Sequence, residues 1–102
     1  MKITADIVTA QSLLNDSKPD GLRINSDSGS KKAINLNIDL NVTFDVAKVA
    51  APIISSWIVA RAIRKGANVS VNSKRLPADD AAARQMIEEA VHNEQEKKQG
   101  GE

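Results

Sequence analysis

Few residues in this chain have the types and spacing that catalysis requires. Its single histidine, His92, lies beyond the apolar face of the C-terminal segment, among Glu88, Glu89 and Glu94. A lone imidazole with no activated nucleophile beside it is typical of a solvated surface residue. No serine stands in the Gly-x-Ser-x-Gly context of a nucleophile elbow. We therefore predict that the protein is not an enzyme.

Oxygen ligands for a metal ion are grouped only along one predicted strand. Asn35, Asn37, Asp39 and Asn41 occupy alternate positions, so their side chains would share one strand face. A calcium ion needs several carboxylates and a tight turn, whereas this row contains one carboxylate. The chain has no cysteine, which excludes thiolate ligands and disulfides. We interpret the row as a hydrated strand face, and predict no metal ion and no cofactor.

A basic interval covers residues 48–75, because no Asp or Glu occurs between Asp45 and Asp79. Its cations could contact nucleic-acid phosphates. The residues concerned are Arg61, Arg64, Lys65, Lys74 and Arg75. The net charge of only +1 and the lack of a recognisable helix-turn-helix or ribbon motif count against nucleic-acid binding. Basic residues in such a position more often keep the end of a helix solvated. A nucleic-acid-binding regulator that uses this interval is therefore the alternative function.

Size and composition limit the remaining classes of protein. A chain of 102 residues fits a single domain, which we place at residues 1–94, followed by a frayed polar tail at 95–102. One Trp, one Phe and no Tyr leave few aromatic platforms for stacking bases or sugars. The uncharged run at 49–60 is too short to span a bilayer, and the N-terminus lacks the apolar run of an export signal. We expect a cytoplasmic protein that does not bind membranes.

Alternating apolar and polar residues predict the strands. In residues 33–44 every second side chain is apolar, which is the period of a strand with one dry face. Residues 22–25 alternate in the same way, and the loop at 26–30 predicts an antiparallel hairpin between the two segments. A further strand or small hairpin is predicted near 68–72.

The first twenty residues allow two interpretations. Ile3, Ala5 and Ile7 alternate as in a short strand, whereas Thr4 precedes apolar residues at the spacing of a capped helix. We favour a short strand or turn that leads into a helix ending near Asn15.

A helix that is apolar on nearly every face is expected after the long strand. Asp45 is a suitable N-cap. Pro52 either kinks a helix at 46–65 or lies in the first turn of a helix at 52–65. Gly66 is expected to end the helix in the left-handed conformation. A helix this apolar must be buried on more than one side.

An amphipathic helix is predicted at residues 80–97, with Asp79 or Asp80 as its cap. Its packing face contains Ala83, Met86, Ile87, Ala90 and Val91. The element order predicts an α+β fold, in which a small antiparallel sheet is covered by the apolar helix and the C-terminal helix.

The dry sheet face and the apolar helix present more hydrophobic surface than two elements can hide. We expect the surplus to contact a second copy of the chain or another protein. The expected contact residues are Ile53, Ile54, Trp57 and Ile58. The function predicted first is therefore a small non-enzymatic interaction or adaptor module that self-associates.

The second half of the chain resembles a known family. An apolar helix with a basic end (SSWIVARAIRKG) is followed by a strand with a turn (NVSVNSKRLP) and an acid-capped helix (ADDAAARQMIEEAV). This succession, roughly residues 53–91, resembles the effector-associated constant component family, which comprises small adaptor modules of bacterial conflict systems. The resemblance implies a bacterial, non-catalytic module that recruits a separate effector.

Overall fold

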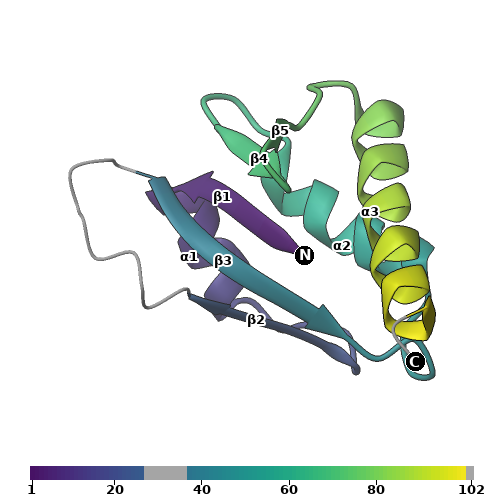
Figure 1. Ribbon diagram of the computed structural model, residues 1–102. Helices are drawn as coiled ribbons and strands as arrows, with labels where there is room; N and C mark the ends of the chain where they lie inside the picture. Colours follow the sequence, from purple (N-terminus) through teal and green to yellow (C-terminus); the bar gives the residue numbers. More distant parts are fainter. Residues whose placement is uncertain (27–36, 101–102) are drawn as a thin grey trace.

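The computed structural model describes residues 1–26 and 37–100, with side chains described up to residue 95. Along the described chain, one strand and then two pairs of strands are each followed by a helix (Figure 1). In chain order they are β1 (Lys2–Asp6), α1 (Ile7–Asn15), β2 (Leu22–Ser26), β3 (Asn37–Phe44), α2 (Ala51–Ala62), β4 (Val69–Val71), β5 (Lys74–Arg75) and α3 (Asp80–Gly100). The predicted α+β fold with a small antiparallel sheet is confirmed.

The sheet has five strands in the order β2-β3-β1-β4-β5, and every neighbouring pair is antiparallel. The N-terminal strand β1 is thus the central one. Ile3 on β1 lies opposite both Leu40 on β3 and Val71 on β4. Because directly opposed residues point to the same side of a sheet, this register gathers the apolar side chains on one face.

The two faces of the sheet differ sharply in polarity. The helices lie on the apolar side (Figure 1), whose buried residues are Ile3, Ala5, Leu22, Ile24, Leu40, Val42, Val69 and Val71. On the opposite side the Thr4 hydroxyl donates to Asp39 Oδ1 at 2.8 Å, and Asn37 and Asn41 are exposed. The hydrated strand face is therefore observed for residues 37–44, while Asn35 and the rest of 33–36 lie outside the described residues.

The predicted antiparallel pairing of β2 with the long strand is confirmed, although the expected loop after Ser26 lies outside the described residues, and the region near 68–72 forms a hairpin, one of its two predicted forms. β2 pairs with β3 from Leu22 opposite Phe44 to Ser26 opposite Leu40. β4 and β5 are joined by Asn72 and Ser73, which have φ angles of 50° and 72°. Positive φ at both central residues is the mark of a type I′ turn, whose twist matches that of the strands it connects.

The N-terminal segment contains both a strand and a helix, as favoured from the sequence. α1 ends at Asn15, where the helix was expected to end. Its N-cap is Asp6 rather than Thr4, because the Thr9 N–H donates to Asp6 Oδ2 at 3.1 Å.

α2 differs from its prediction at both ends. It begins at Ala51 with Pro52 in the first turn, so Pro52 starts the helix and does not kink it. Asp45 does not cap α2. Its carboxylate instead accepts the Ala47 N–H at 3.1 Å in a separate turn. The helix ends at Ala62, before the expected Lys65, and Gly66 (φ +84°) bends the chain in the turn that follows.

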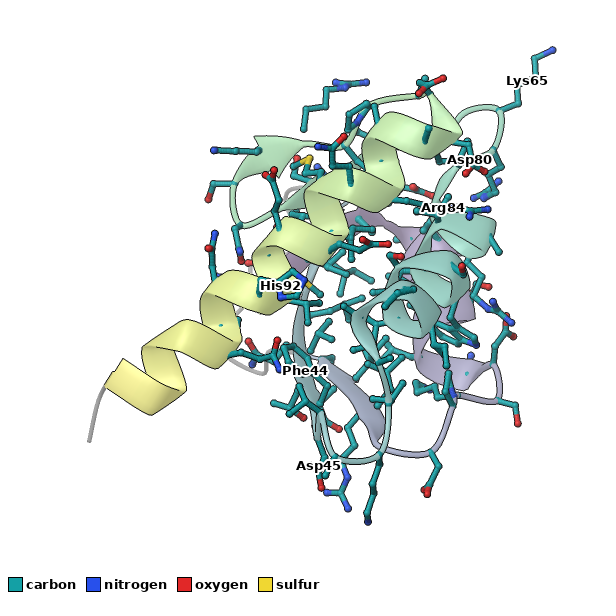
Figure 2. All side chains as sticks on the ribbon, turned by 90° about the vertical axis from the view of Figure 1, so that its right-hand side faces the viewer. Phe44, Asp45, Lys65, Asp80, Arg84 and His92 are labelled. Atoms are coloured by element: carbon teal, nitrogen blue, oxygen red, sulfur yellow. The ribbon has the colours of Figure 1, made fainter. Side chains whose placement is uncertain are left out.

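α2 is buried on more than one side, as expected from its apolar sequence. It packs against the sheet, α1 and α3 (Figures 1 and 2). The buried Ser55 hydroxyl bonds Glu88 Oε2 on α3 at 3.1 Å. The predicted packing face of α3 is confirmed, with Met86 only partly buried. α3 continues to Gly100, beyond the predicted end at residue 97.

Candidate functional site

The four residues predicted to contact a partner lie in different environments. Ile54 and Ile58 are 0% exposed, so the prediction that they form an interface is corrected: they belong to the interior of this chain. Helical geometry explains this, because positions 54 and 58 are one turn apart on the side that faces the sheet and α3. Ile53, on the opposite side, is 51% exposed. Trp57 is half-buried.

Exposed apolar side chains gather where the chain enters α2. Val46 is 47% exposed, and its exposed apolar neighbours continue to Ile53. We call this group the α2 entry patch, and it consists of Val46, Ala47, Ala50, Pro52 and Ile53. Grouped exposed apolar residues, unlike scattered ones, mark interaction sites.

Trp57 is held by the protein's own side chains. Its Nε1 donates to the Ser17 carbonyl oxygen at 2.9 Å, and the Arg61 guanidinium lies 4.1 Å from its ring centroid. Arg61 Nε also pairs with Asp16 Oδ2 at 2.9 Å. A hydrogen bond from the Ser12 hydroxyl, followed by that from Arg61, lowers the pKa of Asp16. Trp57 and Arg61 therefore join α2 to the residues directly after α1, and both side chains are partly exposed.

Arg64 is similarly engaged. Its Nη2 lies 3.3 Å from Asp6 Oδ2 and 3.2 Å from Thr9 Oγ1. Partial burial alone would raise the pKa of Asp6, but hydrogen bonds from the Asn68 and Thr9 N–H groups, aided by Arg64, outweigh burial and lower it. Asp6 thus links β1, the start of α1 and the loop after α2.

The other three cations of the basic interval point to solvent. Lys65, Lys74 and Arg75 are exposed, and within the described part of the chain none of them forms an ion pair. Lys65 projects from the end of the molecule in Figure 2. Arg64 is also exposed, but it is paired with Asp6. Of the five basic residues predicted to contact nucleic acid, these three are thus both exposed and outside the ion pairs of the described residues.

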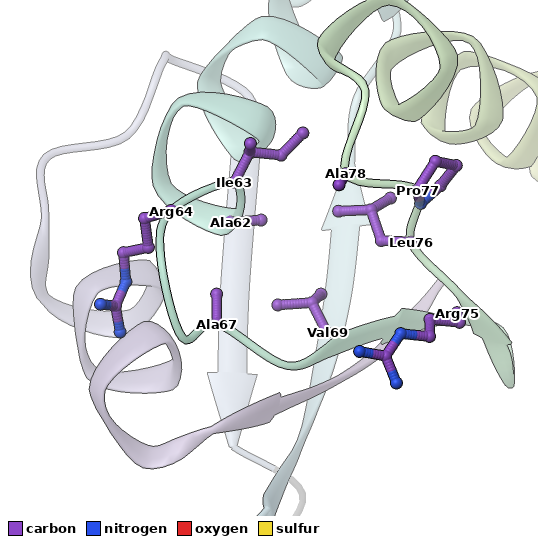
Figure 3. A pocket seen from close by; sticks show the side chains of 9 residues that line it. All are labelled: Ala62, Ile63, Arg64, Ala67, Val69, Arg75, Leu76, Pro77 and Ala78. Atoms are coloured by element: carbon purple, nitrogen blue, oxygen red, sulfur yellow. The ribbon is translucent and has the colours of Figure 1, made fainter.

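A small pocket of about 130 Å³ separates the end of α2 from the β4–β5 hairpin (Figure 3). Most of its lining residues have apolar side chains, but polar atoms make up as much of its wall as apolar atoms do. The Arg64 side chain points away from the other lining residues in Figure 3. The lining residues are Ala62, Ile63, Arg64, Ala67, Val69, Arg75, Leu76, Pro77 and Ala78. No acid or nucleophile accompanies the two arginines in this lining, so the pocket lacks a catalytic pair.

His92 is exposed on α3 (Figure 2). Across residues 1–26 and 37–95, no three His, Asp or Glu side chains group closely enough to hold a metal ion. Within the described helices, none combines the length and hydrophobicity needed to cross a bilayer.

Comparisons with known proteins add no relative: no family model, no curated protein and no solved structure matches the chain.

Two residues that matter in the structure were not singled out by the sequence. Val46 belonged to one of the two predicted helix ranges, 46–65, and lay outside the other, 52–65; its exposure follows from the turn at Asp45. The importance of Asp6 depends on Asn68, far along the chain. An acid directly before the apolar run of α1 was the one local indication of a cap.

Proposed function

We propose that this chain is a small non-enzymatic adaptor that binds a second copy of itself or another protein through the α2 entry patch. The observation that carries the proposal is the exposure of Ile53 and Val46 on one short segment. Burying them would remove apolar surface from water, the main driving force of association. The resemblance of residues 53–91 to bacterial conflict-system adaptors supports the same function and suggests a cytoplasmic bacterial protein.

We expect a photo-crosslinking residue at position 53 to capture the partner. With Ile53 replaced by p-benzoylphenylalanine, irradiation of cells of the native host should give a discrete adduct, identified by mass spectrometry as a second copy or a different protein. The substitution Val46→Asp, which adds a charge to the same patch, should abolish the adduct.

Val8 provides the matched control. It is 60% exposed but lies on α1, away from the α2 entry patch. The same photoreactive residue at position 8 should give no adduct that depends on Val46. Equal crosslinking from both positions, or none from position 53, would refute the proposal.

The second candidate function is a nucleic-acid-binding regulator. It is favoured by the exposure of Lys65, Lys74 and Arg75 without ion pairs in the described chain. Phosphate contacts release counterions, so binding would weaken steeply with salt.

For this function we expect fluorescence polarisation to detect salt-sensitive binding to a labelled DNA or RNA duplex. The double substitution K74A/R75A should reduce the slope of log affinity against log salt by about 2, or about 1 per lost phosphate contact. The control R23A/R84A removes two exposed cations that lie outside the basic interval and should leave the slope unchanged. Absence of binding at low salt would exclude this candidate.

A further inference from the structure

The two edges of the sheet are protected to different degrees. β5 is only two residues long, and both are basic and exposed (Lys74 and Arg75), with Pro77 following closely. Short length, charge and proline are the usual means of preventing a sheet edge from pairing with another chain. β2, at the other edge, has five residues, Leu22–Ser26, with one charged residue, Arg23, and no proline or glycine among them. Among the strands that the structure describes, it pairs on one side only, with β3.

The hydrogen-bond alternation shows which backbone groups of β2 face outward. Met1 and Val42 exchange both backbone bonds, at 3.1 and 2.8 Å. In an antiparallel ladder, the backbone groups of successive residues form hydrogen bonds alternately to one neighbouring strand and to the other. Val42 and Leu40 therefore form their backbone hydrogen bonds with the β1 side. Asn41 and Thr43 form theirs with β2. Asp45, whose N–H donates to the Gly21 carbonyl at 2.9 Å, continues the second series.

The partners of Asn41 and Thr43 on β2 are Asn25 and Arg23. Leu22, Ile24 and Ser26 therefore direct their N–H and C=O groups to the free edge. The Leu22 N–H donates back to Pro19 at 3.1 Å. For the outward N–H groups of Ile24 and Ser26, no acceptor is found among the described residues.

β2 is complementary to itself. In an antiparallel pair centred on Ile24, the two Ile24 residues would exchange both hydrogen bonds. Each Ser26 N–H would reach the Leu22 carbonyl of the other copy. Arg23 would lie opposite Asn25 of the second chain, so no like charges would oppose one another.

The flank of α1 beside β2 adds apolar surface. Thr9 and Asp16 face α2, because they bond Arg64 and Arg61. Ile7 and Leu14 lie about 140–180° around the helix from these two residues, on the flank opposite α2. Ile7 is 42% exposed and Leu14 is partly buried. α1 packs beneath β1, β2 and β3, so continuing the sheet past β2 would bring two such flanks together.

We propose that two copies of this chain pair antiparallel through the free edge of β2, forming a continuous sheet across a two-fold axis. The inference goes beyond the α2 entry patch, since it assigns self-association to a different surface and leaves that patch for another protein. A five-residue edge with two helix flanks makes a small interface, so the dimer is weak and concentration-dependent.

Hydrogen exchange followed by NMR tests the pairing directly. The amides of Ile24 and Ser26 should exchange freely in dilute protein and about tenfold more slowly well above the dissociation constant. The Arg23 and Asn25 amides, already bonded to β3, should be protected at every concentration. Protection that grows with concentration at other amides, or a monomer at every concentration by light scattering, would overturn the proposal.

Ser26→Pro removes an outward N–H that has no acceptor among residues 1–26 and 37–100, so the fold should tolerate it. It should raise the dissociation constant at least about tenfold, because both copies lose a hydrogen bond. A dimer of unchanged affinity would contradict pairing at this edge.

Charge substitutions test the register. Asn25→Lys would place a lysine opposite Arg23 of the other copy and should weaken the dimer about tenfold. Adding Arg23→Glu should restore it. Asn37→Lys, on the same polar sheet face but on β3, is the matched control and should leave the affinity unchanged. Failure of the double variant to recover, with Ser26→Pro still disruptive, would exclude the Ile24-centred register.

The α2 entry patch is tested separately by crosslinking at position 53. An adduct with a different protein there, with β2 amides insensitive to concentration, would retain the proposed adaptor and remove only the edge pairing.

Discussion

Ile58→Ala is expected to lower the free energy of unfolding by about 2–5 kcal/mol, because truncating a fully buried isoleucine loses apolar burial and leaves a cavity. Ile58 is 0% exposed, in the middle of the helix that is covered by the sheet and by α3. Urea denaturation followed by circular dichroism measures the change. For a domain this small, several kcal/mol is a large part of its total stability.

Ile53→Ala is the matched control on the same helix. Ile53 is 51% exposed, so its truncation should change stability by no more than about 0.5 kcal/mol. Comparing the two variants separates the apolar residues of α2 that stabilise the core from those that are exposed for association. If Ile58→Ala had normal stability but impaired association, Ile58 would be an interface residue, as predicted from the sequence, and not a core residue.

Asp6→Ala is expected to lower the free energy of unfolding by about 2 kcal/mol, from the lost helix cap and the lost bond to the loop after α2. Its carboxylate accepts the Thr9 N–H at 3.1 Å and the Asn68 N–H at 2.9 Å. Asp45→Ala is the control, since that exposed acid accepts only the Ala47 N–H in a turn. It should cost clearly less in the same urea titration.

The pH dependence identifies the charge of Asp6 as the cause. Its pKa in the folded protein lies below the ordinary value of 3.8, so the unfolded chain binds this proton more readily. The stability that the carboxylate contributes is therefore complete above pH 3.8 and is lost as the pH falls through the folded pKa. The difference between wild type and Asp6→Ala should shrink on acidification. A constant difference would mean that the ionised carboxylate is not responsible.

Arg61 and Arg64 each form an ion pair with an acid of the same chain, which reduces the positive charge of the basic interval. Along the chain these arginines belong to a long stretch without acids, which favours an anion-binding surface. In the fold Asp16 and Asp6 lie against them. These acids come from α1 and the end of β1, so much of the local positive charge is already compensated within the protein.

The amino-acid sequence by itself determined the period of the long strand and of the two later helices, whereas residues 3–14 allowed either period. Alternation along residues 37–44 specified a strand with one wet face, and the all-round apolarity of α2 required burial on several sides. These features are local, because a strand or helix turns its side chains at a constant interval. The end of the first helix near Asn15 was also expected from the sequence.

Only the tertiary structure decided which strands are neighbours and which apolar residues remain exposed. Nothing local places the N-terminal strand at the sheet centre or leaves β2 at an edge, because strand order depends on contacts between distant segments. Ile53 and Ile54 are adjacent and chemically identical, yet one faces water and the other the core. That difference arises because the sheet and α3 cover only part of the α2 surface. The orientation of the helix about its own axis therefore decides which of the two residues is buried.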